Sequence, residues 1–576
     1  MGEEGKSPKT KAPKKKRIFV EQKPIIVGGI VAVVAIAGIV SGVVLFTQEE
    51  QRKGGTFIFG FGVGMFCLDN ILEYYPGTET HIVLDQIAEG LFDYEITSKE
   101  TRIIPNLAED SDWNDDATEL TCTLRKNVKF HDGTQFNATV VKWNFERLNG
   151  LLNKSYYPYM WYLADGTPIL NDTLVIDDYT VKFVLNKPFI PFKALLCTLQ
   201  SYILSPSSTP KNDFIDLLTG KLIGTGPFIY DSSAFSYDPI YEEYHHVNTT
   251  LLPNRHYWGK KPNFDKVVFK VFDNYTKRCE ALFSKDIHFT EILLPLKPEN
   301  FTCISGLKTG TTYTTDIWNI WMDNSEIETA MRKAISYALD YTRLLTIPAG
   351  TTIIRCKSPL SKGMLYANWE DFNVPEYDIQ TARQALIDAN WPGTEGLTAN
   401  DDISPGNPWE TKALSSSPLE TYNFTYIIGN ERRYAMASLF HENLTQIGIN
   451  VTLIGVTWAN FWDVPNQFLL MGWGPDYNDP ANNINPLFSS KADGYSNLFQ
   501  FNDAQIQEWI EEGLEETDLI AREQLYYDIQ ERLIEELYPC IWYYTPLAEF
   551  AYVSNLRGIN YLAIPYKFLL KNAYFA

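Results

Sequence analysis

The short motifs of common enzyme and metal-binding classes are missing from this chain of 576 residues. Its seven cysteines include no CxxC pair, and this spacing excludes zinc-ribbon and thioredoxin-type sites. There is also no GxSxG, HExxH or P-loop sequence to support hydrolase, metalloprotease or nucleotide chemistry. We therefore expect no catalytic residue, no metal site and no cofactor.

Positive charge is scarce, except at the N-terminus. The chain has 49 Lys and Arg against 71 Asp and Glu, for a net charge of −22, yet residues 1–24 hold eight basic and three acidic residues. The KKKR run in this segment is also typical of nucleic-acid binding, but so acidic a body disfavours a phosphate partner. We interpret the basic segment as a topology signal and expect no nucleic-acid partner.

A long uncharged run follows at once. Residues 25–46, IIVGGIVAVVAIAGIVSGVVLF, form about 33 Å of helix at 1.5 Å per residue, enough for a hydrocarbon core of ~30 Å. The flanking lysines predict a cytoplasmic tail (1–24), one transmembrane helix (25–46), a linker (47–53) and a large extracellular domain at the cell membrane. A cleaved signal peptide is the alternative, but the run is long and no small-residue cleavage site follows it. No cysteine follows closely, which disfavours a lipoprotein anchor.

Asn-x-Ser/Thr sequons fit an exported surface and predict a glycoprotein. They lie at Asn137, Asn153, Asn171, Asn248, Asn274, Asn300, Asn423, Asn443 and Asn450.

Hydrophobic periodicity predicts an α/β fold with several sheets. Short β-rich runs dominate residues 100–190, whereas later segments alternate between strand and helix patterns. Strand 422–428, helix 433–446 and strand 450–454 form a predicted βαβ unit, and an apolar strand at 468–473 precedes the loop GPDYNDP. The remaining expected elements are a first strand at 56–61, strands at 120–124, 180–185 and 540–544, and helices at 327–339 and 525–537.

Six segments, in order, resemble one protein family. They are QIAEGLFDYE (86–95), the run from Ile103 to Leu148, GTGPF (224–228), NRHYWGKKPNFDKVVF (254–269), MRKAISYALDYTRLL (331–345) and GWGPDYNDP (472–480). Together they resemble the family 5 extracellular solute-binding proteins of peptide and nickel ABC transporters, over residues 54–576. The resemblance implies a two-lobed, periplasmic-binding-protein type II (Venus-flytrap) fold with an extra inserted subdomain. The implied boundaries are 54–85, 222–315 and 541–576 for lobe one, 86–221 for the inserted subdomain, and 316–540 for lobe two.

The resemblance also implies ligand-binding residues. In peptide-binding members the aspartate at the place of Asp476 takes the ligand's α-ammonium, because a desolvated ammonium needs a fixed counter-charge. The alternative is that Asp476 only shapes a turn. Trp473, just before the loop, is a candidate aromatic wall or a core residue, and Trp318 and Trp321 are lower-ranked candidates.

Other polar groups are interpreted as structural. A turn role before Pro480 is favoured for Asp479, and acidic residues with neighbouring histidines at 242–246 are interpreted as a solvated loop. Asp132-Gly133 beside His131 is a turn pair, and Asn137 is a predicted helix N-cap.

One departure from the family pattern concerns ligand length. Dipeptide-binding relatives use an arginine near the end of the strand corresponding to 422–428, and this strand has none, while Arg432 and Arg433 start the next helix. The sequence therefore predicts a non-enzymatic receptor for peptides, longer ones rather than dipeptides, with an ABC permease as partner. Oligosaccharide or nickel-complex binding and a non-transport sensor or adhesion role are the alternatives. An uncleaved anchor without a lipobox favours an archaeal source.

Overall fold

The computed structural model describes residues 54–576, except 72–77, 97–100, 156–157, 164, 239–242, 294–295, 348–351, 458–459, 462–463, 465, 492–496, 498 and 563–566. The predicted tail, transmembrane helix and linker lie outside the described residues, as does Glu242. In the described ranges no helix has the length and apolarity needed to cross a membrane. The described residues from 54 to 576 form one compact unit.

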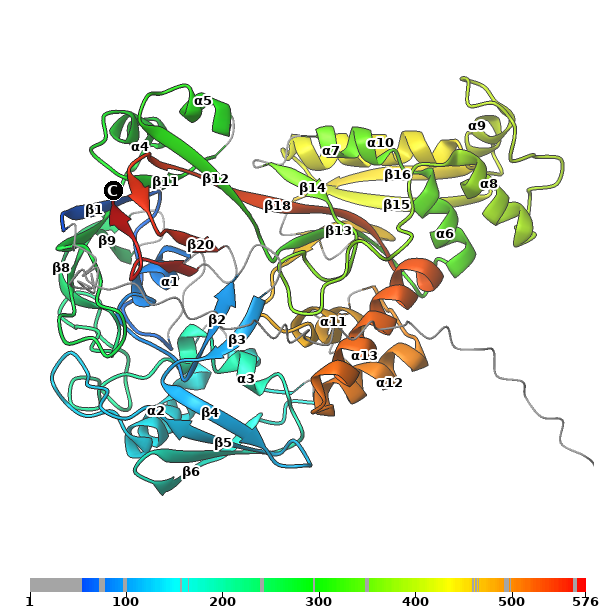
Figure 1. The fold of residues 1–576 in the computed structure, drawn as a ribbon. Helices are drawn as coiled ribbons and strands as arrows, with labels where there is room; N and C mark the ends of the chain where they lie inside the picture. The colour runs from blue at the N-terminus through cyan, green and yellow to red at the C-terminus, as the bar shows by residue number, and fades with distance from the viewer. Residues whose placement is uncertain are drawn as a thin grey trace, which may run out of the picture. The chain divides into compact units, whose positions relative to one another are not determined.

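A mixed sheet of 12 described strands runs through this unit (Figure 1). Its order is β16-β15-β17-β13-β18-β11-β1-β10-β9-β8, and β12 and β14 also pair with β18. The bounds are β1 Thr56–Phe61, β8 Phe228–Asp238, β9 Glu243–Pro253, β10 Lys266–Val271, β11 Phe289–Glu291, β12 Leu307–Tyr313, β13 Ile317–Met322, β14 Ile353–Arg355, β15 Glu420–Ile427, β16 Ile449–Val456, β17 Phe468–Trp473 and β18 Cys540–Val553.

Strand β18 joins the two halves of this sheet. Its first residues pair with β13 and β14, and its last residues pair with β11 and β12. Because β12 leads directly into β13, two chain connections pass between the halves here. We call this region, residues 314–316 together with the middle of β18, the hinge segment.

The first half packs around one core and carries a separate smaller body. Core residues of the first half come from Phe57 to Ala88, Leu199 to Leu307 and Ala551 to Ala573, and residues from Ile71 to Ile203 form a second core. That second core holds the sheet β4-β5-β7-β6 and helix α2. The helices and strands of the smaller body are β2 Phe92–Ile96, β3 Thr101–Pro105, β4 Ala108–Trp113, β5 Glu119–Leu124, α2 Ala138–Leu151, β6 Leu170–Asp177, β7 Thr180–Leu185 and α3 Phe192–Leu195. The rest of the first half contains the helices α1 Thr78–Leu84, α4 Tyr275–Phe283 and α5 Pro298–Thr302.

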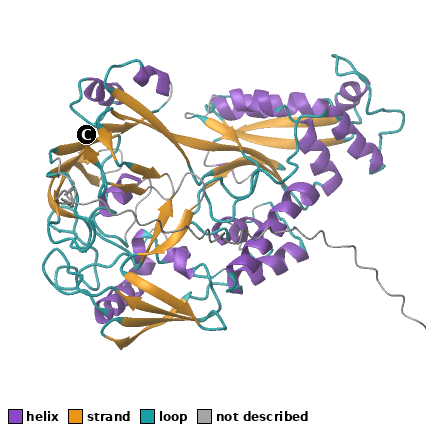
Figure 2. Cartoon of the chain, viewed as in Figure 1, coloured by secondary structure: helices purple, strands orange, loops and turns teal. Residues whose placement is uncertain are grey.

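The second half confirms the predicted βαβ unit. Strands β15 and β16 pair in parallel, and helix α10, Glu431–Thr445, lies along them (Figure 2). One core packs on each face of the sheet. Its other helices are α6 Thr329–Ala338, α7 Tyr341–Thr346, α8 Ile379–Asp388, α9 Pro408–Ala413, α11 Ala481–Phe488, α12 Ala504–Glu515 and α13 Leu519–Arg532. After β18 the chain ends with four short strands, β19 Leu556–Arg557, β20 Asn560–Leu562, β21 Lys567–Leu569 and β22 Tyr574–Phe575.

One helix ends differently from the prediction. Instead of running to residue 537, α13 changes at Leu533 into a π-helical turn, Leu533–Leu537, and Tyr538 then adopts a left-handed φ of 50°. The Arg332 guanidinium donates from Nε to the Leu537 carbonyl at 3.1 Å, which satisfies an end group of this turn.

Candidate functional site

Gly472 of β17 and Gly474, just after that strand, leave space beside the start of β13. Trp318 pairs with Gly472, and a Cβ added to Gly472 would lie 2.5 Å from the Trp318 ring. A Cβ added to Gly474 would lie 2.6 Å from Oδ1 of Asp316. Because side chains alternate along a strand, Asp316 and Trp318 point to the same face of the sheet.

A β-bulge adds an aromatic side chain to this face. The register of β13 against β18 shifts between Trp318 and Asn319, so that Trp318 lies opposite Tyr544. Their rings stack at 5.8 Å between centroids with 6° between planes. The bulge brings both Tyr543 and Tyr544 into the core on this face, and burial raises the pKa of Tyr543 to about 12.

Arg432 covers these two rings. Its Cζ lies 4.7 Å from the Tyr544 ring centroid and 5.8 Å from that of Trp318. The side chain of Asn430 accepts the Arg433 N–H at 3.0 Å, and this N-cap starts α10 so that Arg432 falls in its first turn. We call Asp316, Trp318, Arg432 and Tyr544 the hinge cluster.

The charges of the hinge cluster lack described partners. Nε and Nη2 of Arg432 are buried and have no hydrogen-bond partner among the described residues. Arg433 donates to the Leu470 carbonyl at 2.9 Å, and burial together with the neighbouring Arg432 charge lowers its pKa. Burial raises the pKa of Asp316 to about 6. The site therefore holds a guanidinium and a carboxyl that form no ion pair with any described residue, both near one aromatic pair.

The predicted site residues fall on both faces of the sheet. Trp321 is 2% exposed and stacks on Phe499 in the core of the opposite face, so it offers no surface to a ligand and we leave it out of the proposed site. Trp473 is half-buried on that same opposite face, where its indole N–H donates to the Asn482 carbonyl at 3.0 Å. Asp476 is half-buried in the loop after β17, and its N–H donates to Oδ1 of Asn482 at 2.9 Å.

Asp479 is engaged in a buried ion pair. Nη1 and Nη2 of Arg522 donate to its two carboxylate oxygens at 2.8 and 2.7 Å, and Asp479 Oδ1 also accepts the Ala481 N–H at 2.9 Å. These contacts leave Asp479 a structural role, as the turn interpretation predicts.

The loop with Asp476 also contacts the smaller body of the first half. The Asn478 N–H donates to the Tyr94 hydroxyl at 3.1 Å, and this hydroxyl donates to the Ala194 carbonyl at 3.1 Å. A backbone hydrogen bond of 2.8 Å from Ile190 to Leu514 adds a second link. Tyr94 thus connects the inserted region to the loop that follows β17.

Several of the family-like segments converge on Glu89 rather than on the hinge cluster. Its buried carboxylate accepts from Thr225 at 2.7 Å, Tyr257 at 2.6 Å and Trp258 at 2.9 Å, and burial raises its pKa. Three separate segments are therefore held together by one carboxylate.

The other polar groups assigned to structure do pack that way. His131 contacts the Gly226 carbonyl through Nε2 at 3.0 Å, and Asn137 accepts the Val140 N–H at 3.0 Å as the N-cap of α2. His246 differs from the prediction of a solvated loop, because it is 2% exposed and lies 2.6 Å from Ser233. Asn443 is 4% exposed and accepts the Asp340 N–H, so this sequon is closed to a glycan. The described residues contain no group of three His, Cys, Asp or Glu side chains that could hold a metal ion.

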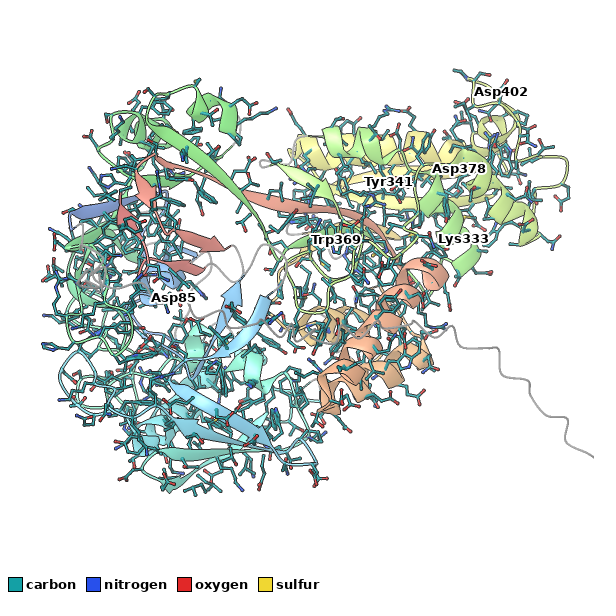
Figure 3. The ribbon with its side chains drawn as sticks, viewed as in Figure 1. Asp85, Lys333, Tyr341, Trp369, Asp378 and Asp402 are labelled. Atoms are coloured by element: carbon teal, nitrogen blue, oxygen red, sulfur yellow. The ribbon has the colours of Figure 1, made fainter. Side chains whose placement is uncertain are left out.

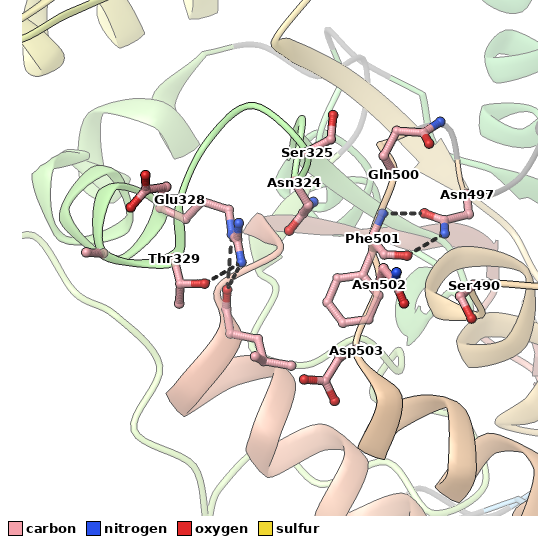
Figure 4. Close-up of a pocket in the computed structure, with 13 residues that line it drawn as sticks. Asn324, Ser325, Glu328, Thr329, Ser490, Asn497, Gln500, Phe501, Asn502 and Asp503 are labelled. Atoms are coloured by element: carbon pink, nitrogen blue, oxygen red, sulfur yellow. Dashed lines mark hydrogen bonds between the residues drawn. The ribbon is translucent and has the colours of Figure 1, made fainter.

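A polar cavity of about 800 Å³ lies elsewhere, between α6 and the segment that leads into α12 (Figure 4). Its walls include Asn324, Thr329, Asn497 and Asp503, and no member of the hinge cluster lines it. Asn497 bridges the backbone of Phe501, with bonds of 2.9 and 2.7 Å, so the side chains seen there chiefly hold the local chain. We assign this cavity no function.

The missed site residues are Arg432, Tyr544 and Asp316. Asn430 is a recognisable N-cap, so the sequence signalled that Arg432 starts a helix, but not that its side chain reaches back over β13. The bulge that brings Tyr544 beside Trp318 leaves no mark in the periodicity. Asp316 precedes an apolar strand, where an acidic residue is ordinary.

Comparisons with known proteins agree with this fold. The model of bacterial extracellular solute-binding proteins, family 5 Middle, matches residues 102–495. The chain is 26% identical over 445 residues to the probable D,D-dipeptide-binding periplasmic protein DdpA of Escherichia coli, covering 74% of this chain and 76% of that protein. HbpA2 from Haemophilus parasuis has a similar structure, with a TM-score of 0.76 at 18% identity over 91% of this chain and 100% of that one. The ABC transporter-associated periplasmic binding protein DppA from Helicobacter pylori, in complex with the peptide STSA, matches with a TM-score of 0.63 at 21% identity, over 92% and 99% of the two chains.

Proposed function

We propose that this chain, which belongs to the bacterial extracellular solute-binding proteins of family 5, is the receptor of an ABC importer and binds a peptide-like solute at the hinge cluster. The family consists of solute-binding proteins and not of enzymes, and the two-lobed α/β fold is that of its periplasmic relatives. The ligand, its length and the partner permease are parts of the proposal.

The observation that carries the proposal is that two nitrogens of the Arg432 guanidinium, Nε and Nη2, are buried without a hydrogen-bond partner among the described residues. Buried N–H groups without an acceptor are costly, so they are rare unless something binds them. The cost is higher here, because the first turn of a helix favours anions and disfavours cations. A ligand carboxylate would satisfy the Nε and Nη2 atoms that have no described partner.

Arg432 changes the argument about ligand length. The sequence disfavoured dipeptides because the strand corresponding to β15 lacks an arginine, but Arg432 brings a guanidinium to Trp318 from the next helix. A free C-terminal carboxylate therefore has a candidate partner, and short peptides enter the proposal beside longer ones. A neutral oligosaccharide would leave the Arg432 charge uncompensated, and no observation favours a nickel complex.

Asp476 remains the proposed partner of the ligand's α-ammonium, and Trp473 remains a proposed wall. Support for Asp476 comes from its place in the loop that follows β17, next to Gly474 of the hinge-cluster face. Closure of the lobes around the ligand would then add contacts that the open state lacks.

Anchoring is proposed from the sequence. Residues 25–46 would span the cell membrane once, with residues 1–24 in the cytoplasm and the described unit outside, next to the permease. Glycosylation of the exposed sequons and an archaeal source belong to the same proposal.

Ligand-dependent stabilisation tests the receptor function. The full-length chain in detergent should gain about 2.7 kcal/mol of stability from a peptide at a hundredfold excess over Kd. The peptide should be recovered intact by chromatography. Conversion of the peptide into fragments would reject the receptor in favour of an enzyme.

A further inference from the structure

Asp316 is a second functional group of the hinge cluster that the receptor function does not yet use. It lies in the hinge segment, immediately before β13. No hydrogen bond or ion pair joins its carboxylate to any of the described residues, although Gly474 approaches so closely that a Cβ there would lie 2.6 Å from Oδ1. The strand alternation places it on the same face as Trp318.

Other aspartates at the starts of elements behave differently. Asp340, Asp378 and Asp518 each accept a backbone N–H in the first turn of the helix they cap. Asp479 is paired with Arg522. Asp316 caps no helix, closes no turn and pairs with no described cation, so stability gives no reason for a carboxylate here.

Asp316 and Arg432 lie near the same side chain. The Arg432 Cζ is 4.7 Å from the Tyr544 ring, and Asp316 is close enough for its charge to raise the pKa of Tyr544, to which burial contributes most. Even so, no ion pair joins the two. Opposite charges beside one aromatic group, neither of them paired within the described residues, match a solute that carries both signs within a short span.

We propose that Asp316 binds the ammonium group of a short zwitterionic solute, an amino acid or small peptide, whose carboxylate binds Arg432. This inference rests on the proposed receptor function and deepens it. It makes Asp316 a ligand-binding residue, and it predicts that the solute bridges the hinge segment and the first turn of α10. For a short solute Asp316 thus takes the ammonium in place of Asp476, which keeps that proposed role for longer peptides.

The proposal has a characteristic pH dependence. Burial raises the pKa of Asp316 to about 6, and only the ionised carboxylate attracts an ammonium group. Affinity should therefore be full above about pH 7 and fall as the pH drops through 6, with a proton released on binding near pH 6. The charged groups around Tyr544 are Asp316 itself, Arg432 and Arg433 from α10, and Arg355 of β14, which pairs with Tyr544 and stacks on Tyr341.

Asp316→Asn is a sharp test, because it keeps the shape and removes the charge. An unpaired buried carboxylate destabilises the fold, so the variant should melt at the same or a higher temperature than the wild type. Asp323→Asn is the matched control, since Asp323 accepts the Ser325 N–H at 2.9 Å in an exposed turn and faces no part of the hinge cluster. The probe is whichever of di-, tri- and tetra-alanine binds the full-length wild type most tightly, together with its N-acetylated form.

Calorimetric titration gives the deciding result. We expect Asp316→Asn to weaken the free peptide ten- to a hundredfold, to flatten the pH profile between 5 and 7, and to leave the N-acetylated peptide unaffected. Asp323→Asn should change none of these. An unchanged affinity and pH profile in Asp316→Asn would overturn the inference while leaving the receptor intact, whereas a wild type that binds none of these peptides would overturn both.

Discussion

The buried ion pair of Asp479 and Arg522 allows a quantitative prediction about the loop at 474–480. If Asp479 stabilises the fold and does not bind the ligand, its replacement should lower the stability of the protein by a predictable amount. Both side chains are almost fully buried, at 3% and 2% exposure, and the two bonds of 2.8 and 2.7 Å form a bidentate fork. Asp479→Asn removes the counter-charge and leaves the guanidinium buried. Breaking one partner of such a pair costs about 3–5 kcal/mol, so we expect a loss of that size in the free energy of unfolding.

A surface pair of the same geometry supplies the control. Arg343 and Glu442 form a similar fork at 2.6 and 3.0 Å, but their side chains are 53% and 57% exposed. Glu442→Gln should therefore cost no more than about 1 kcal/mol, because water solvates the separated charges. Replacing both buried partners, as Asp479→Leu with Arg522→Met, should recover most of the loss.

Urea unfolding of these variants without ligand measures the costs. The reasoning would be refuted if Asp479→Asn and Glu442→Gln cost the same, or if Asp479→Asn unfolded like the wild type while losing peptide binding. In the second case Asp479 would be a ligand residue, and the assignment of this loop would have to be reversed.

Three further predictions concern other parts of the chain. Tyr94→Phe should weaken peptide binding about tenfold, because the Asn478 N–H loses its acceptor when the lobes are together. Tyr341 (Figure 3) supplies the control, since Tyr341→Phe removes a buried 2.7 Å hydrogen bond to the Ser336 carbonyl within the second half and should not weaken binding. Equal effects of the two substitutions in a binding titration would reject the link between Tyr94 and the loop. Burial, with a smaller effect of the His245 charge, lowers the pKa of His246 to about 4, so the unfolded state binds the proton first as the pH falls. The free energy of unfolding should therefore fall by up to about 3 kcal/mol between pH 6.5 and 4. In urea titrations His246→Gln should lose this dependence on pH, and an unchanged dependence would show that another group is responsible. Protease added to intact cells should remove the large domain, and protection until lysis would contradict the proposed topology.

The sequence predicts where helices and strands lie better than it predicts on which face of a sheet a side chain lies. The strand at 56–61 and the βαβ unit are confirmed because their periodicity is local, with apolar side chains at strand or helix spacing and Gly448 as a terminator. Trp318 and Trp321 are three residues apart on one strand, so they point to opposite faces, and only the packing shows that Trp321 faces a core. The bulge beside Trp318 then decides which aromatic residue of β18 joins it.

Charged site residues were the hardest to predict. The strand β15 carries no arginine near its end, but Arg432 reaches the face of β13 from the next helix. Such a contact joins residues more than a hundred positions apart, and no spacing rule encodes it. The family-like segments around Glu89 likewise lie far apart in the sequence and meet where its carboxylate holds them together.

The central claim is that Arg432 binds the carboxylate of a peptide-like solute, and a double comparison tests it most directly. Calorimetric titration of the wild type and Arg432→Gln is done with one peptide and with its C-terminal amide. Arg432→Gln should weaken the free acid by ~2–5 kcal/mol, because the partner charge is lost in a buried setting, and should barely affect the amide. An equal loss for the acid and the amide would contradict the account, because Arg432 would then support the aromatic pair without binding the solute.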